Sequence, residues 1–149
     1  MDVHATLEAP CGAAELFAFV DDLAKYPAWM DLVHRVEPFV VPDDESPAWQ
    51  VELRGRVGPL ARSKRLRMQR TVHDVERHRV VFERAEGDGR KHSPWVLTAQ
   101  VVQRDELSEL LMHLHYGGAL WTGGVLERVL GDQITQGRQR LVQLVSSTH

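Results

Sequence analysis

The chain has 149 residues, of which 43% are hydrophobic and 26% are charged, a size and composition that allow a globular domain to bury a core without disulfides or metal. The formal net charge of −3 argues against wholesale nucleic-acid binding, so no nucleic acid is expected among its partners. The one cysteine, Cys11, cannot form an internal disulfide and suits a reducing compartment.

The N-terminal residues lack the basic segment and apolar core of a signal peptide. No stretch approaches the roughly 18 consecutive apolar residues that indicate a transmembrane helix. We therefore expect a cytoplasmic monomer or homodimer with a single domain over residues 1–149.

The N-terminal part of the chain begins as a strand and continues as helix. Apolar and polar residues alternate over 2–9, which predicts a half-buried strand. From Ala13 onward the apolar residues recur at helical spacing. Pro27 is expected to end this helix at or before Tyr26, because the residue before a proline avoids the helical region. A second short helical turn is expected over 28–32.

Alternation in the middle of the chain predicts six further strands. Because each carries apolar side chains on one face, we expect an antiparallel meander with one solvated face. The expected ranges are 33–41, 48–57, 63–75, 78–84, 95–103 and 107–116.

The C-terminal part returns to helical spacing. Most apolar residues in 120–145 fall three, four or seven positions apart, which predicts a long amphipathic helix. Gly131 and Gly137 interrupt it, each costing about 1 kcal/mol relative to alanine, so we expect the helix to approach the sheet or a ligand closely there. Only this helix is long enough to cover a curved seven-stranded sheet. Such a sheet leaves a concave apolar space at its open end, which is a common ligand site.

The stretch LEAPCGAAELFAFVDDLAKYPAWM, the order of the strands and the long last helix together resemble the SRPBCC superfamily. This superfamily includes START-like lipid-transfer domains, polyketide aromatase/cyclases and the major birch pollen allergen. The resemblance covers essentially the whole chain and implies an α+β helix-grip fold, with a seven-stranded curved antiparallel sheet wrapped around a long C-terminal helix. It also implies a deep hydrophobic cavity. Members bind lipids, sterols, polyketides, quinones or plant hormones, and a few are enzymes.

One face of the predicted sheet is rich in large apolar side chains that can pack as core or line a cavity. For any single residue, packing is the simpler interpretation, whereas for the set a curved sheet favours a cavity. In the superfamily the cavity opens where Trp29 and Met30 are expected, against the C-terminal helix near Trp121. The residues expected to contact a ligand are Trp29, Trp49, Leu53, Met68, Arg70, Phe82, Arg84, Trp95, Leu97, Met112, Tyr116 and Trp121.

Two arginines are expected on this apolar face. Arg70 is in register with Met68, and Arg84 is in register with Phe82. A buried guanidinium must be paired, and no acidic residue lies within the strands on that face, so the partner could be a carboxylate, enolate or phenolate of a ligand. In a cyclase mechanism Arg70 would stabilise an enolate, with Tyr116 as the second catalytic candidate. Alternatively, both arginines reach solvent or a loop carbonyl near the strand ends.

Histidines on the outer face form a further group. His113 and His115 lie two apart on the last strand, and pairing of the first strand with the last, as in the superfamily, would bring His4 beside them. Imidazoles bind zinc, but no carboxylate or cysteine stands at a recognisable ligand spacing, so no metal site is expected. His73 is also expected on the outer face.

The segment 54–70, RGRVGPLARSKRLRMQR, is strongly basic. Its outward-facing arginines could dock anionic lipid, an acidic protein or RNA, or could simply form a solvated sheet face. No aromatic stacking platform accompanies them, which disfavours single-stranded nucleic acid. The four arginines are Arg54, Arg56, Arg65 and Arg67.

The motifs of phosphate loops, serine hydrolases, zinc proteases and dithiol redox sites are absent from the sequence. We therefore favour a non-enzymatic protein, without a cofactor, that binds or transports a small hydrophobic ligand such as a lipid, polyketide or quinone-like molecule. The alternative is a polyketide cyclase/dehydrase type of enzyme. A third possibility is a protein-interaction module that uses the basic face.

Overall fold

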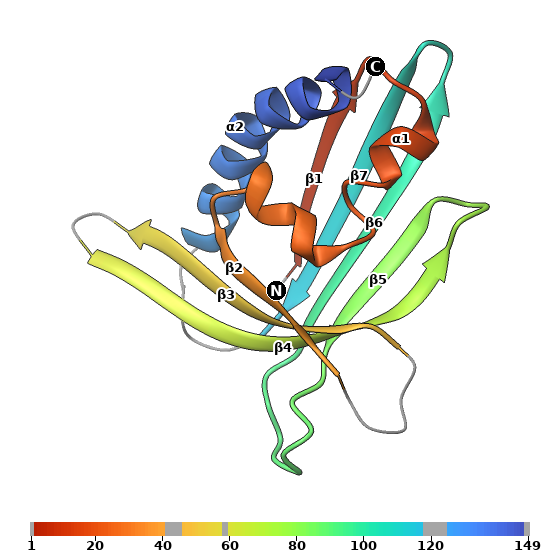
Figure 1. Cartoon of the computed structure of the whole chain (residues 1–149). Helices are drawn as coiled ribbons and strands as arrows, with labels where there is room; N and C mark the ends of the chain where they lie inside the picture. The colour runs from red at the N-terminus through yellow and green to blue at the C-terminus, as the bar shows by residue number, and fades with distance from the viewer. Residues whose placement is uncertain (1, 41–45, 58–59, 118–124, 148–149) are drawn as a thin grey trace.

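Seven strands form one antiparallel sheet that curves around the long helix α2 (Figure 1). The computed structural model describes residues 2–40, 46–57, 60–117 and 125–147. The strand order is β1-β7-β6-β5-β4-β3-β2, so the first and last strands are neighbours. This is the α+β helix-grip fold that the sequence predicts. In chain order the elements are β1 (Asp2–Ala9), α1 (Ala13–Phe17), the 3₁₀-helix η1 (Leu23–Ala28), β2 (Val33–Phe39), β3 (Ala48–Val57), β4 (Leu60–Asp74), β5 (Arg79–Arg84), β6 (Trp95–Arg104), β7 (Leu107–Tyr116) and α2 (Val125–Ser147).

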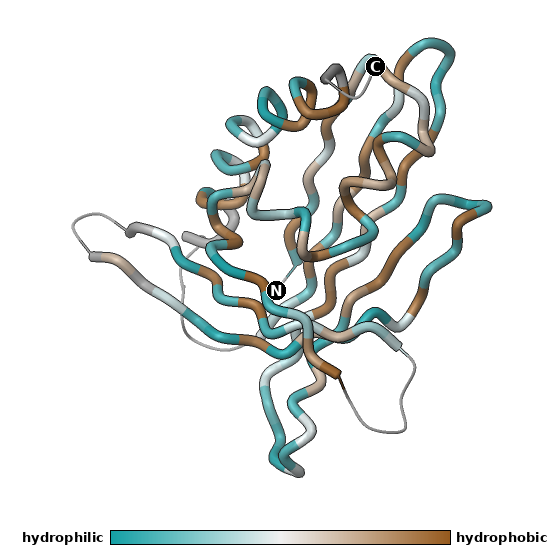
Figure 2. Tube along the Cα trace, viewed as in Figure 1, coloured by the Kyte–Doolittle hydropathy of each residue, from teal (hydrophilic) through white to brown (hydrophobic). Residues whose placement is uncertain are grey.

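The alternation of apolar and polar residues gives the sheet two different faces, and Figure 2 shows the two colours alternating along the strands. The predicted strands 2–9, 48–57 and 107–116 are confirmed. The others differ by a few residues at their ends, as strand boundaries often do. The predicted end of one strand at residue 41 and the predicted start of the last helix at residue 120 lie outside the described residues.

A β-bulge in β4 reverses the side-chain orientation predicted for the residues beyond it. Thr71 is the extra residue between Arg70 and Val72, each of which pairs with β5. Because side chains alternate with a period of two, one extra residue exchanges the two faces beyond it. The outward orientation predicted for His73 is therefore wrong, since its ring stacks on Phe17 of α1 with 5.9 Å between the centroids.

Two short helices, α1 and η1, lie between β1 and β2 as predicted, but the bounds predicted for both are wrong. Helix α1 ends at Phe17, and η1 begins only at Leu23. Pro27 lies inside η1 instead of ending a helix. Asp22 caps η1, because its carboxylate accepts a hydrogen bond from the Ala24 amide at 2.9 Å.

Side chains from η1 and the following turn donate hydrogen bonds to main-chain carbonyls just beyond α1. Buried or partly buried carbonyls need hydrogen-bond partners, and these side chains provide them where the α-helix has stopped. The donors and acceptors are Lys25 Nζ to Ala18 O (2.8 Å), Tyr26 Oη to Val20 O (2.8 Å) and Trp29 Nε1 to Phe19 O (3.3 Å).

Helix α2 rests directly on Trp29, which is fully buried. A Cβ atom at Gly137 would overlap the main-chain oxygen of Trp29, so the helix is closely approached here, but by the turn after η1 and not by the sheet or ligand that was predicted. At Gly131 the prediction is wrong, because an added Cβ would meet nothing within 4 Å. The amide of Leu32 donates to Gln133 Oε1 at 2.7 Å and ties α2 to the same turn.

Helix α1 packs against β6 and β7 at one end of the sheet. Two hydrogen bonds fix it there: Ser108 Oγ donates to the Cys11 carbonyl at 2.6 Å, and the Ala13 amide donates to Gln103 Oε1 at 2.8 Å. We call this region the filled end. Its buried side chains include Leu7, Leu16, Phe17, Val101 and Leu110.

Within the described part of the chain, no helix has the length and apolar character needed to cross a membrane.

Candidate ligand-binding site

A cavity of about 90 Å³ lies between the sheet, η1 and helix α2. Its volume is several times the roughly 10–15 Å³ that one water molecule needs, and its walls are almost wholly apolar. We call this region the hollow end. The lining residues are Val3, Ala5, Leu23, Tyr26, Met30, Leu32, Val33, Val51, Leu53, Leu66, Met68, Trp95, Leu97, Met112, Leu114, Leu130 and Ile134.

The hollow end differs from the filled end in what each element contributes. Along β1, Ala5 faces the cavity, whereas Leu7 belongs to the filled end. Helix α2 covers the cavity with Leu130 and Ile134, which lie one turn apart. Helix α2 contacts Trp29 at Gly137. The small side chain of Ala5, in β1 below the helix, therefore leaves space open.

Two of the lining residues carry a polar atom on an aromatic ring. The Tyr26 hydroxyl donates to the Val20 carbonyl. Burial, followed by the nearby charge of Asp21, raises the pKa of Tyr26 far above its ordinary value, so the hydroxyl stays protonated. The indole Nε1 of Trp95 is also buried, and it has no hydrogen-bond partner among the described residues.

The predicted ligand-contact residues divide into groups. Five of them line the cavity: Leu53, Met68, Trp95, Leu97 and Met112.

Four other predicted residues are buried in the core without lining the cavity. Trp29 lies under α2. Trp49 packs edge-on against Phe82 with 5.6 Å between the ring centroids, and Tyr116 packs against Trp95 at 5.4 Å. These rings support the walls. Trp121 lies outside the described residues.

Arg70 and Arg84 do not line the cavity, and both have partners within the protein. Arg70 donates to the Asp21 carbonyl at 2.9 Å. Arg84 forms a largely buried ion pair with Glu86 at 2.8 Å. A ligand anion is therefore not needed to pair either guanidinium group. The sequence argument considered acidic residues within the strands, whereas Glu86 follows the end of β5.

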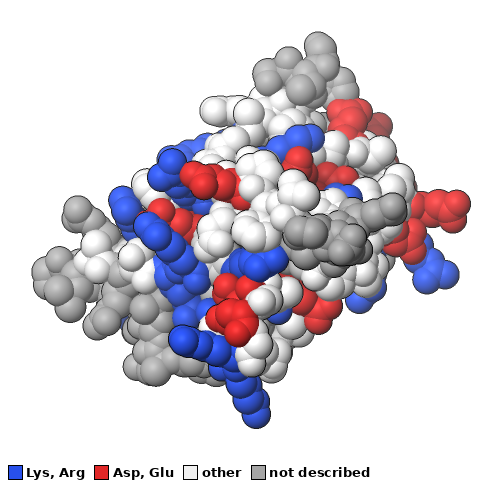
Figure 3. Space-filling model, turned by 60° about the horizontal axis from the view of Figure 1, so that its bottom comes forward, with Lys and Arg blue, Asp and Glu red and all other residues white. Residues whose placement is uncertain are grey.

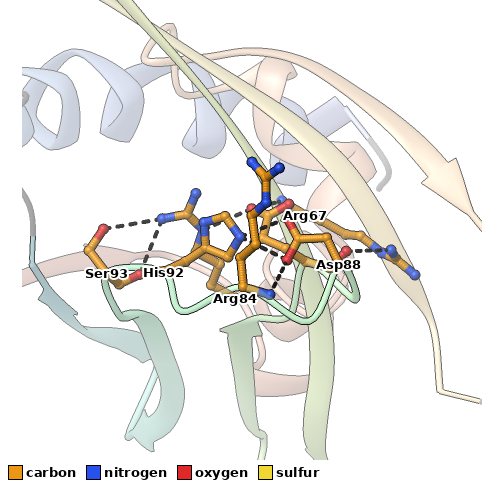
Figure 4. A network of polar contacts seen from close by, with 7 residues as sticks. Arg67, Arg84, Asp88, His92 and Ser93 are labelled. Atoms are coloured by element: carbon orange, nitrogen blue, oxygen red, sulfur yellow. Dashed lines mark hydrogen bonds and ion pairs between the residues drawn. The ribbon is translucent and has the colours of Figure 1, made fainter.

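Arg84 belongs to a polar network at the end of β5, beside the middle of β4 (Figure 4). It also donates to the carbonyl and hydroxyl of Ser93 at 3.2 and 3.1 Å. Nearby, Arg67 donates to the Glu86 carbonyl at 2.7 Å. Burial, together with repulsion from Arg84, lowers the pKa of Lys64. These contacts hold the loop after β5 against β4.

The sequence interpretation did not include much of the cavity lining among the ligand contacts. The alternation of the strands already placed Val3, Ala5, Val51 and Leu66 on apolar faces, which was the available signal. The lining also draws on the turn after η1, where Met30 enters the wall. The resemblance to the superfamily had placed this turn at the opening of the cavity, and Met30 does line it.

Pairing of β1 with β7 brings the outer-face histidines together, as expected. His4 pairs with His113, and their rings stack with 4.3 Å between the centroids. The Asp2 carboxylate contacts His113 Nε2 at 2.8 Å and His115 Nδ1 at 3.0 Å. These contacts lower the pKa of Asp2. Over the residues that the structure describes, no cluster of three or more His, Cys, Asp or Glu side chains could hold a metal ion.

The outer face of β2, β3 and β4 carries charges of both signs, and Figure 3 shows basic and acidic side chains interspersed. Arg35 pairs with Glu37 at 2.9 Å, and Arg54 pairs with Glu52 at 3.3 Å. A polar hollow of about 370 Å³ on this face is lined by Arg35, Glu37, Gln50, Glu52 and Arg65.

Several solved structures share this architecture over nearly their whole length. A protein from Thermus thermophilus is 15% identical with a TM-score of 0.73, over 99% of each chain. A START superfamily protein from Mycobacterium smegmatis is 15% identical with a TM-score of 0.69, over 99% of each chain. The Zhui aromatase/cyclase from a Streptomyces species is 12% identical with a TM-score of 0.63, over 99% of this chain and 92% of that one.

Neither a protein-family model nor a curated protein matches the sequence. At identities this low, structural likeness establishes the fold, and function has to be argued from the site. The resemblance to the SRPBCC superfamily is confirmed at this level: the chain has the helix-grip fold of START-like proteins and aromatase/cyclases.

Proposed function

We propose that the protein binds a small hydrophobic molecule in the cavity of the hollow end. The cavity itself is the observation that carries the proposal, because it is lined by apolar side chains from the sheet, η1 and α2. Apolar concave sites of this kind are the usual binding places for small molecules. The START superfamily protein and the aromatase/cyclase among the similar structures agree with this assignment.

The lining also limits the charge of the bound part of the ligand. No Asp, Glu, Lys or Arg is among the described lining residues, and burial of an unpaired charge is very costly. The ligand, or the part of it that enters, is therefore neutral. We propose that five of the lining residues predicted from the sequence contact it: Leu53, Met68, Trp95, Leu97 and Met112.

A titration with indane, a compact neutral hydrocarbon, tests the proposal. Ala5 lines the cavity from β1, so Ala5→Leu fills part of it. The matched control is Ala61→Leu on β4, where the side chain is exposed. Calorimetry should show binding to the wild type with a negative heat-capacity change. Ala5→Leu should weaken binding by about tenfold or more, the loss expected when a ligand forfeits the burial of two methylene groups, and Ala61→Leu should leave it unchanged.

Absence of binding to the wild type, for indane and for a wider panel of neutral lipids, polyketides and quinones, would contradict the proposal. Equal affinities of both variants and the wild type would contradict the location. Circular dichroism of each variant confirms that the fold persists.

The two alternative functions have less support. An aromatase/cyclase would need a charged or polar group at the reacting atoms, but Arg70 donates to a main-chain carbonyl, and Tyr116 packs behind Trp95. Loss of turnover of a polyketide substrate in a folded Arg70→Ala variant would favour the enzyme instead. On the outer face, Glu37 and Glu52 offset neighbouring arginines, which weakens the case for an acidic docking partner.

A further inference from the structure

The two edge strands of the sheet are covered to different degrees. Helix α2 packs against β1, and Arg138 Nε donates to the Glu8 carbonyl at 3.2 Å. The opposite edge is β2, which pairs with β3 on one side only. Although η1 contacts β2, the side chains of the strand beyond Val33 are exposed, except for the half-buried Val36. An edge of this kind presents main-chain groups that can pair with a strand of another chain.

Pro38 indicates which main-chain groups of β2 face away from β3. It pairs with Trp49 in regular register, although it has no N–H to donate. Proline is tolerated in an edge strand where its nitrogen faces outward. Alternate residues direct their main-chain groups to the same side of a strand, so the N–H and C=O of Val36 also face the open edge. Val36 therefore offers one donor and one acceptor to a neighbouring strand.

The charges on either side of Val36 are self-complementary. Arg35 and Glu37 lie on the outer face and form an exposed ion pair at 2.9 Å. When two copies of β2 pair antiparallel about a two-fold axis at Val36, the two Val36 residues exchange two hydrogen bonds. Arg35 of each copy then stands opposite Glu37 of the other. A two-fold axis at Arg35 or at Glu37 would instead place like charges opposite each other, which is destabilising.

Exposed apolar side chains follow at the end of the same strand. Phe39 is 39% exposed and Val40 is 85% exposed. The guanidinium group of Arg67 lies over the Phe39 ring, 3.8 Å from its centroid. In the register centred on Val36, Phe39 lies diagonally across from Arg35 of the second copy, a separation that an aromatic side chain can bridge. Pairing of the two strands therefore also covers apolar surface that the single chain leaves open.

We propose that the protein forms a homodimer in which the β2 strands of two copies pair antiparallel about Val36 and join the two sheets into one. This proposal goes beyond the proposed function and does not depend on it. Arg35 and Glu37 are the residues that set the register. Because the contact is confined to one strand of each copy, the interface is small and the dimer should form only at high protein concentration.

Charge reversal tests this arrangement by sedimentation velocity over a concentration series at low salt. Arg35→Glu and Glu37→Arg each place like charges opposite one another on both sides of the axis. Each should weaken dimerisation by about tenfold or more, because the change enters the interface twice. The matched control is Arg104→Glu, which breaks an exposed ion pair with Glu109 between β6 and β7. It should leave dimerisation unchanged.

An equimolar mixture of the two reversed variants provides the sharper test. Every opposed pair across the axis then carries opposite charges, so the mixture should dimerise as the wild type does. The ion pair within each chain stays broken in the mixture, so recovery reports on the contact between copies alone. A wild type that is monomeric at about 0.5 mM would overturn the proposal. A dimer that both reversals leave intact, or that mixing does not restore, would overturn it as well. Indane binding should be the same in all these variants, so the dimer and the proposed function can fail separately.

Discussion

The two ends of the sheet share strands β1, β6 and β7 but are closed in different ways. At the filled end, α1 contributes Phe17, and hydrogen bonds from Ser108 and to Gln103 hold the start of the helix on β6 and β7. At the hollow end, α2 forms the cover, and the apolar walls leave about 90 Å³ unfilled. An amphipathic sheet therefore gives either core or cavity, depending on what covers each part.

The position of α2 explains why space is left unfilled at the hollow end. Gly137 allows the helix to touch the main chain of Trp29, and the turn that follows supplies two polar ties. One joins Leu32 to Gln133, and the other is the ion pair between Asp31 and Arg140. The segment 29–32 thus holds α2 in place, and the small side chain of Ala5 on β1 leaves part of the space below the helix unfilled.

The largest expected effect is a difference in the free energy of unfolding between alanine variants of two leucines that lie four residues apart on β7. Leu110 is fully buried at the filled end, whereas Leu114 is partly exposed and lines the cavity. Leu110→Ala should lower the free energy of unfolding by about 3–5 kcal/mol, because it creates a new cavity. Leu114→Ala should lower it by only about 1–2 kcal/mol, because part of its surface already faces open space. Urea unfolding measures both, and equal losses would show that the two ends are packed alike.

The next effect concerns the contact that fixes α2. Gly137→Ala should lower the free energy of unfolding by about 1–3 kcal/mol, because the added methyl group overlaps the main chain of Trp29. The matched control is Gly131→Ala in the same helix, where the space is open. That change should stabilise the protein by up to about 1 kcal/mol through helix propensity. Stabilisation by both changes would mean that Trp29 does not support the helix.

The smallest effect lies on the outer surface of the hollow end. Hydrogen bonds with His113 and His115 hold the pKa of the Asp2 carboxyl below its ordinary value of 3.8. A carboxyl with a depressed folded-state pKa contributes stability above its ordinary pKa, and this contribution is lost as the pH falls through the lowered value. Between about pH 5 and about pH 3, the wild type should therefore lose slightly more thermal stability than Asp2→Asn. Parallel melting curves over that range would contradict the assignment.

Strand alternation predicted most of the fold, because a period of two is a local property of the sequence. It located β1, β3 and β7 to the residue, and it placed Leu53 and Met112 on the face that lines the cavity. It failed at Thr71, because a bulge is set by pairing with the neighbouring strand.

The first helix could not be placed from periodicity alone. Its end depends on the hydrogen bonds that Tyr26 and Trp29 donate to the carbonyls of Val20 and Phe19. These are tertiary contacts that override local helical preference. The same limit applied to Arg84, whose partner Glu86 follows the strand and was not considered.

Methyl NMR of the protein titrated with indane tests the central claim most directly. If the hollow end is the binding site, the methyl resonances that shift should belong to Leu53, Leu97, Leu114, Leu130 and Ile134, which line the cavity. Those of Leu7, Leu16 and Leu110 at the filled end should stay in place. Shifts at the filled end, or no shifts at saturating ligand, would contradict the account.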